Sequence, residues 1–151
     1  MEQYDPIQPD EIILRRIPES QVGTDDPRWP LPAGFDPHRT NDTDGLSVYR
    51  EKHHSPEQVA GFRTKGTKPT WVARISAKSI IDLGLTLIPD PRGPEYGLPA
   101  RPGHALIKEI NSDHRKSDKV AEWKQGLVSK VIDVAGGDTG FAAPNAPSDE
   151  T

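Results

Sequence analysis

At 151 residues and a net charge of −4, the chain has room for one domain with a modest hydrophobic core. It has no cysteine, which excludes disulfides and cysteine-ligated metal sites. It also lacks an apolar run of about 18 residues and a signal-peptide pattern, so we expect a cytoplasmic protein without membrane contact. Its 16 Pro and 13 Gly predict long loops around a folded centre.

The first part of the chain is predicted to be poor in regular structure. Residues 1–10 form a flexible arm in this interpretation, and a strand follows over residues 11–17. Residues 19–43 are then predicted to be a long proline-rich loop. A loop of about 25 residues without its own secondary structure is uncommon in a compact domain and is either functional or poorly ordered.

A strand and a short helix are expected next. Residues 46–50 follow an Asp-Gly turn and alternate apolar and polar side chains, which is typical of a strand. Ser55 then precedes Pro56, with Gln58 three residues after the serine. This pattern combines an N-cap, a proline at the first helical position and a capping box, and it predicts a helix of about two turns.

The most apolar stretch of the chain predicts a compact strand–helix–strand–strand unit. A β-branched and aromatic run predicts a strand over 71–76. Ser76 is expected to cap a short helix, and Gly84 stands where a left-handed C-terminal cap is needed. Two strands are then predicted, over 85–88 and over 104–110.

The longest helix is predicted to begin at Ser112 or Ser117. Its apolar residues follow a period of 3.6 and form one stripe, which we expect to pack on the sheet: Val120, Trp123, Leu127, Val128 and Val131. Residues 133–151 are predicted to be a disordered tail. The predicted fold is therefore a single α+β domain over 11–132, with a small mixed β-sheet, two short helices and a longer C-terminal amphipathic helix; the strand order stays open.

His104 is the strongest candidate for a catalytic residue, because it begins a strand after a Pro-Gly pair and its imidazole could reach a cleft from there. A cleft there would bring it near Tyr49, Arg50 and Glu51, the weak candidates for catalytic residues. The competing interpretation is a structural histidine bonded to nearby backbone. The spacing has no specificity, and the chain has no nucleophile elbow, phosphate loop or dinucleotide fingerprint. We therefore lean against an enzyme, and we predict no metal site and no cofactor.

The charge distribution suggests a second function, nucleic-acid binding by the basic segment 52–78. Residues 50–78 hold seven Lys or Arg against two Glu. Phosphates are bound by clustered cations, and exposed aromatic side chains stack on bases. Lys65 and Lys68 are the binding candidates, with Phe62 and Trp71 interleaved. The overall acidity of the chain weighs against nucleic-acid binding. Phe62 and Trp71 are also expected to be core residues, which would keep them from stacking on bases.

Two sequence blocks carry a resemblance to other proteins. The blocks Asp-Gly-Leu-Ser-Val-Tyr-Arg at 44–50 and Pro-Gly-His-Ala-Leu-Ile at 102–107, with weaker ones at 14–18 and 83–85, resemble those of a loose set of short uncharacterised bacterial proteins. This resemblance spans roughly residues 11–111. It implies a bacterial accessory protein from a mobile or conflict-related locus, and it supplies no catalytic residues.

Protein binding is the function that we favour from the sequence. Residues 1–46 hold ten acidic residues against four basic ones, and their long loop contains Trp29 and Phe35. Loops on a rigid scaffold are a common place for binding sites. The sequence therefore favours a protein-interaction module whose partner is another protein, with Trp29 and Phe35 as contact residues. Nucleic acid is the alternative partner, and the sequence does not set the oligomeric state.

Overall fold

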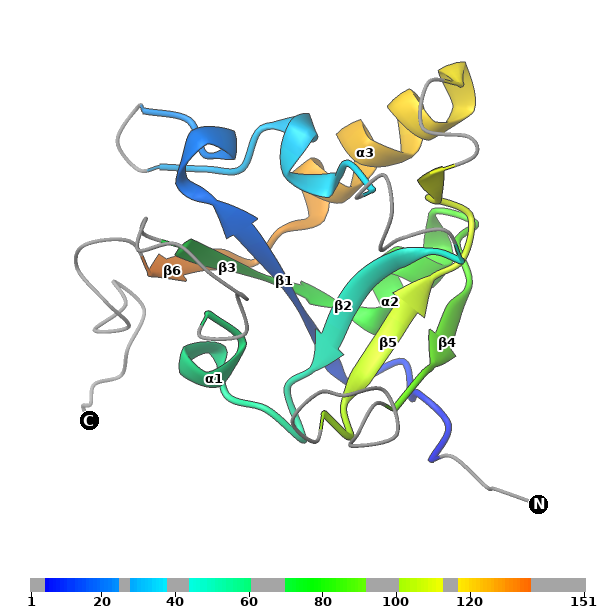
Figure 1. Cartoon of the computed structure of the whole chain (residues 1–151). Coiled ribbons are helices and arrows are strands. Elements are labelled where there is room, and N and C mark those ends of the chain that lie inside the picture. The colour runs from blue at the N-terminus through cyan, green and yellow to red at the C-terminus, as the bar shows by residue number, and fades with distance from the viewer. Residues whose placement is uncertain are drawn as a thin grey trace.

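The structure is a computed structural model that describes residues 5–24, 28–37, 44–60, 70–91, 101–112 and 117–136. Six strands form one sheet in the order β4-β5-β2-β1-β3-β6 (Figure 1). The strands are β1 Ile12–Pro18, β2 Leu46–Arg50, β3 Thr70–Ser76, β4 Leu87–Pro89, β5 His104–Ile107 and β6 Asp133–Gly136. The helices are α1 Pro56–Ala60, α2 Ala77–Asp82 and α3 Asp118–Lys130, with short 3-10 helices at Glu19–Gln21 (η1) and Pro32–Phe35 (η2).

The α+β class and the longer C-terminal helix are confirmed. The sheet differs in one respect from the mixed sheet that the sequence suggested, because all five pairs between neighbouring strands are antiparallel. Among the described helices the longest has 13 residues, and none is both long and apolar enough to cross a membrane.

Local side-chain caps explain where the helices begin. Ser55 and Gln58 form the reciprocal capping box, with the backbone N–H of each bonded to the side chain of the other at 3.0 and 3.2 Å. Ser76 and Ser117 each accept a hydrogen bond from the backbone N–H three residues later, at 3.0 and 3.1 Å. Gly84 has a φ of 91° directly after α2, as a left-handed C-terminal cap requires.

The main core lies between one face of the sheet and the layer made by α3, α2 and η2. The apolar stripe of α3 faces this core, as predicted: Val120 and Leu127 are fully buried, and Trp123 is half-buried against it. Leu83, just after α2, packs so closely on Gly126 that a Cβ there would lie 2.8 Å from a Leu83 methyl. The helix glycine therefore has a packing role.

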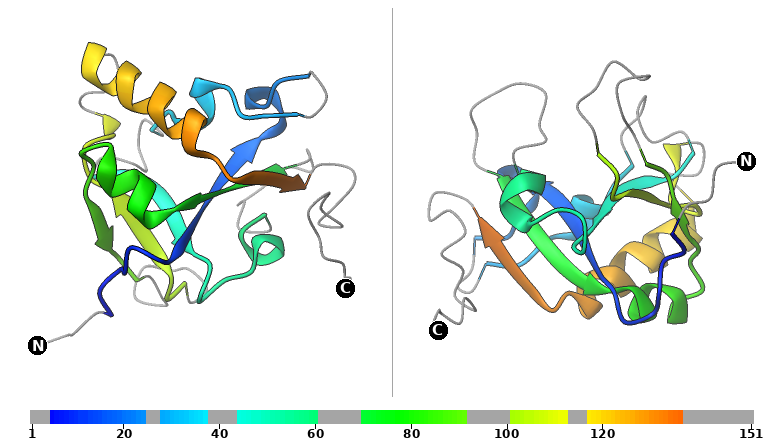
Figure 2. Two further views of the ribbon diagram at one scale, coloured as in Figure 1. Left: turned by 180° about the vertical axis from the view of Figure 1, so that it is seen from behind. Right: turned by 90° about the horizontal axis from the view of Figure 1, so that it is seen from below.

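A smaller core lies on the opposite face of the sheet, under α1. Leu14, Tyr49 and Val72 from three strands meet Val59 of α1 there, and all four are buried. Figures 1 and 2 show α3 and α1 on opposite sides of the sheet. Consecutive strand residues point to opposite faces, so Tyr49 faces α1 while its neighbours Val48 and Arg50 face the other way.

β1 and β3 lie within one residue of their predicted bounds, and three other segments differ more. Residues 133–136, expected at the start of a disordered tail, form β6, which pairs with β3 from Trp71↔Gly136 to Arg74↔Asp133. The predicted strand 104–110 ends at Ile107, because the backbone turns there and the Ile110 N–H bonds to the Ile107 carbonyl. The strand predicted over 85–88 runs from Leu87 to Pro89, and a proline is tolerated because β4 is an edge strand.

The proline-rich loop 19–43 has more structure than the sequence indicated. Besides η1 and η2, its described parts contain an antiparallel bridge between Val22 and Pro30. Arg15 of β1 stabilises the loop from beneath: its guanidinium donates to the backbone carbonyls of Gly34, Ser47 and Asp36 at 2.9, 2.9 and 3.2 Å. These bonds explain why a charged side chain stands on the core-facing side of β1.

Candidate functional site

Arg50, a candidate catalytic residue, is the anchor of the N-terminal segment. Its side chain is 2% exposed, and its guanidinium makes two bonds to the Glu11 carboxylate, at 2.8 and 2.5 Å. It also donates to the carbonyls of Asp5 and Pro6 at 2.7 and 3.1 Å. Burial raises the pKa of Glu11, but the hydrogen bonds from Arg50 and Gln8 outweigh it and leave that pKa below its ordinary value. Arg50 thus fixes residues 5–11 to the sheet.

His104, the central catalytic candidate, has a structural environment. It is 2% exposed. Its Nδ1 lies 2.9 Å from the Asp90 carbonyl and 3.1 Å from the Asp90 carboxylate, and its Nε2 lies 3.1 Å from the Ser47 hydroxyl. The Tyr49 ring meets it edge-on, with 5.3 Å between centroids. Because both nitrogens are engaged and the ring is enclosed, this histidine holds β5 and the residue after β4 on β2.

Glu51, the last catalytic candidate, belongs to a third arrangement. Its carboxylate takes two bonds from Arg74 of β3, at 3.0 and 3.1 Å, and Arg74 also bonds to Asp133 of β6 at 2.8 Å. The four candidates therefore do not converge on one cleft. Tyr49 and His104 lie together on the α1 side, whereas Arg50 points to the other face and Glu51 bridges towards β6.

The basic segment 52–78 is largely neutralised where the structure describes it. Each of its described cations pairs with a carboxylate, namely Lys52 with Asp5 at 2.6 Å, Arg74 with Glu51 and Asp133, and Lys78 with Asp82 at 2.7 Å. Trp71 donates its indole N–H to Glu19 at 2.5 Å, and the Arg28 guanidinium covers its ring at 4.9 Å. Phe62, Lys65 and Lys68 lie outside the described residues.

Trp29 and Phe35 anchor the proline-rich loop. Phe35 is completely buried in the main core, so it is a packing residue and cannot present a contact surface in this conformation. Trp29 is half-buried and donates its indole N–H to the Val128 carbonyl of α3 at 3.3 Å. Between them Leu31 is 43% exposed. Among the described residues of this loop, Leu31 presents an exposed apolar side chain.

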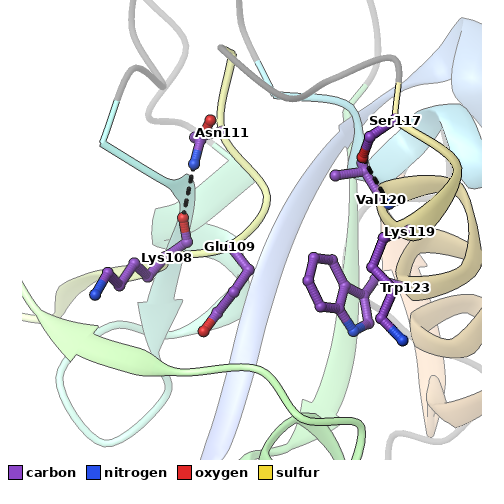
Figure 3. A pocket seen from close by; sticks show the side chains of 7 residues that line it. All are labelled: Lys108, Glu109, Asn111, Ser117, Lys119, Val120 and Trp123. Carbon is purple, nitrogen blue, oxygen red and sulfur yellow. Dashed lines mark hydrogen bonds between the residues drawn. The ribbon is translucent and has the colours of Figure 1, made fainter.

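A pocket of about 370 Å³ opens between the end of β5 and the start of α3 (Figure 3). Its lining residues come from two short segments of the chain: Lys108, Glu109, Asn111, Ser117, Lys119, Val120 and Trp123. The Trp123 ring faces the Glu109 side chain across the space. The walls are mainly apolar although most of the residue types are polar, because long side chains expose their methylene stems there.

The polar side chains that line the pocket differ in the contacts that hold them in place. The Glu109 carboxylate accepts two bonds from Thr86, at 2.8 Å from the backbone N–H and 2.6 Å from the hydroxyl. The Lys119 ammonium lies 5.5 Å from the Trp123 ring centroid. Lys108 is exposed and makes no ion pair with another described residue. The pocket has the size of a small binding site, which typically measures about 300 to 1,000 Å³.

Sequence reasoning missed this pocket for a physical reason. Trp123 was recognised only as part of the core-facing stripe, and its half-buried position is what leaves part of its ring to the pocket. Lys108 and Glu109 follow β5 and had no distinguishing pattern. A tryptophan within a short helical stripe, rather than leucine or valine, is the one signal that could have suggested an exposed aromatic edge.

In the part of the chain that the structure describes, no three His, Asp or Glu side chains are grouped so that they could hold a metal ion. No protein-family model, curated protein or solved structure matches the chain.

Proposed function

We propose that the protein is a small accessory module that binds another protein, and that the pocket between β5 and α3 receives an apolar side chain of that partner. The observation that carries this proposal is the half-buried Trp123 at an open, mainly apolar pocket. Aromatic side chains in such positions are enriched among residues that contribute most to protein binding.

The rival functions have less support from the described residues. The catalytic candidates bind one another or their neighbours, in three separate arrangements, and the described cations of the basic segment are matched by carboxylates. By contrast, Lys108 at the pocket rim is exposed. A bacterial origin, a mobile or conflict-related locus and a cytoplasmic location are part of this proposal and rest on the sequence alone.

Affinity capture tests the proposal. Tagged protein is incubated with lysate of its source organism, with and without nuclease, and bound proteins are identified by mass spectrometry. We expect a dominant protein that survives nuclease and is lost with Trp123→Ala and with Lys108→Glu. Lys108→Glu changes an exposed rim residue and leaves the core intact, so it separates loss of binding from loss of folding.

Ile132→Ala is the matched control, and Leu31→Ala tests an alternative site. Ile132 is 49% exposed beyond the other end of α3, so its loss should leave capture unchanged. Leu31→Ala tests the proline-rich loop as the contact surface. Loss of the partner with Leu31→Ala but not with the pocket variants would move the site to that loop. Capture that disappears with nuclease would point instead to nucleic acid.

A further inference from the structure

A hydrogen bond between His54 and Gly103 joins two turns at one end of the sheet. His54 lies between β2 and α1 and is 5% exposed. Its Nε2 accepts a bond of 2.9 Å from the backbone N–H of Gly103, in the turn before β5. The contact is tight, because a Cβ at Gly103 would lie 2.7 Å from His54 Cδ2 and 2.8 Å from the His53 Cβ.

The bond defines the protonation state of the ring. A backbone N–H can only donate, so Nε2 must carry a lone pair and the imidazole must be neutral. A proton on Nε2 would place two donors against each other. A buried polar group that loses its partner is costly, and the turn would have to move away.

The described groups around the ring do not favour a positive charge. Tyr49 of β2 meets His54 edge-on, with 5.9 Å between centroids, and also contacts His104. Arg101 donates to the Tyr49 hydroxyl at 3.4 Å, and His53 is the preceding residue in the same turn. Across the turn, Glu57 on α1 is exposed. The carboxylate of Asp90 lies against His104.

We infer that the bond from Gly103 to His54 is a proton-sensitive latch, which holds the turn at residues 101–103 when His54 is neutral and releases it when Nε2 is protonated. The Gly103 carbonyl accepts a hydrogen bond from the Arg50 backbone N–H at 2.9 Å, which continues the pairing of β2 with β5 by one residue. The bond from the Gly103 N–H to His54 holds the same residue through its other backbone group. Loss of the latch therefore loosens the end of this strand pair first.

The direction of the pH effect follows from the environment. Burial lowers the pKa of His54 below its ordinary value of 6.5, and the charges of His53 and Arg101 add to this. The unfolded chain then binds a proton at higher pH than the folded chain. The stabilisation is complete above the unfolded pKa, and it is lost as the pH falls from that value through the folded pKa.

Nuclear magnetic resonance on the full chain tests the latch. The ring nitrogens of the histidines and the Gly103 amide are followed from about pH 8 to about pH 4, which brackets the ordinary histidine range. We expect the Gly103 amide proton and His54 Nε2 to shift together, with a midpoint below the ordinary histidine value of 6.5. A Gly103 resonance that stays constant while His54 titrates would overturn the inference, as would a His54 midpoint at or above 6.5.

Two variants make the assignment specific. In His54→Gln the amide oxygen can accept from Gly103 but does not titrate in this range, so the shift of the Gly103 amide should disappear. Persistence of that shift would assign it to another group and contradict the latch. In His53→Gln the concerted transition should remain. This second variant alters an exposed residue, so it tests the inference even if His54→Gln does not fold.

Discussion

Replacement of Arg50 by methionine should destabilise the protein more than any surface change. The variant leaves the Glu11 carboxylate, 7% exposed, without the guanidinium that makes two bonds to it, and it removes the donors to the Asp5 and Pro6 carbonyls. Breaking a buried ion pair by removing one partner costs about 3 to 5 kcal/mol. The total stability of a small domain is about 5 to 15 kcal/mol, so a large fraction should be lost.

Urea unfolding measures this loss, followed in parallel by tryptophan fluorescence and circular dichroism. The matched control is Lys78→Met, which breaks an exposed pair with Asp82 whose side chains are 69% and 58% exposed. That pair should be worth no more than about 0.5 kcal/mol. The double variant Glu11→Gln, Arg50→Met should recover part of the stability, because no buried charge remains.

The pH dependence of the Arg50→Met effect provides a second check. In the wild type the pKa of Glu11 lies below its ordinary value of 4.5, so its ionised form stabilises the fold above the unfolded pKa, and this contribution is lost as pH falls through the folded pKa. Without Arg50, burial raises the pKa of Glu11. The stability difference between variant and wild type should therefore shrink on acidification. A cost below about 1 kcal/mol at neutral pH, or one that pH does not change, would refute the buried-pair reasoning.

Four further substitutions test the packing and the backbone by the same urea assay. Leu127→Ala should cost about 2 to 5 kcal/mol because the residue is fully buried; a cost near zero would contradict its core placement. Gly45→Ala should cost about 1 to 3 kcal/mol, and it should cost more than Gly84→Ala. Both glycines have positive φ, but only at Gly45 would a Cβ meet a backbone atom, the Ile107 oxygen at 2.8 Å. Ser117→Ala should cost about 0.5 to 2 kcal/mol as an N-cap loss, and no loss would argue against the cap.

The sequence predicts well the features that depend on near neighbours. The caps at Ser55, Ser76 and Ser117 use partners three residues away, so their spacing is readable in the sequence. The stripe of α3 is readable for the same reason. Element type and the α+β class follow from such local patterns.

The features that the sequence did not predict depend on distant partners. The β6 strand is short, ends in glycine and gains its stability from pairing with β3, about sixty residues earlier in the chain. Arg50 was a catalytic candidate because nothing local shows its pairing with Glu11, 39 residues away. The interpretation of His104 as a structural histidine bonded to nearby backbone agrees with its contact with the Asp90 carbonyl. The identity of its partners could not be read from the sequence, since Asp90 and Ser47 reach it from two other segments.

Protein binding at the pocket is tested most directly by mapping a captured partner onto the chain with amide chemical shifts. Purified partner is added to isotope-labelled protein. We expect the largest shifts at Lys108, Asn111 and the first two turns of α3, together with the indole N–H of Trp123. Shifts confined to the loop around Leu31 or to β3, or no shifts at all, would contradict a binding site between β5 and α3.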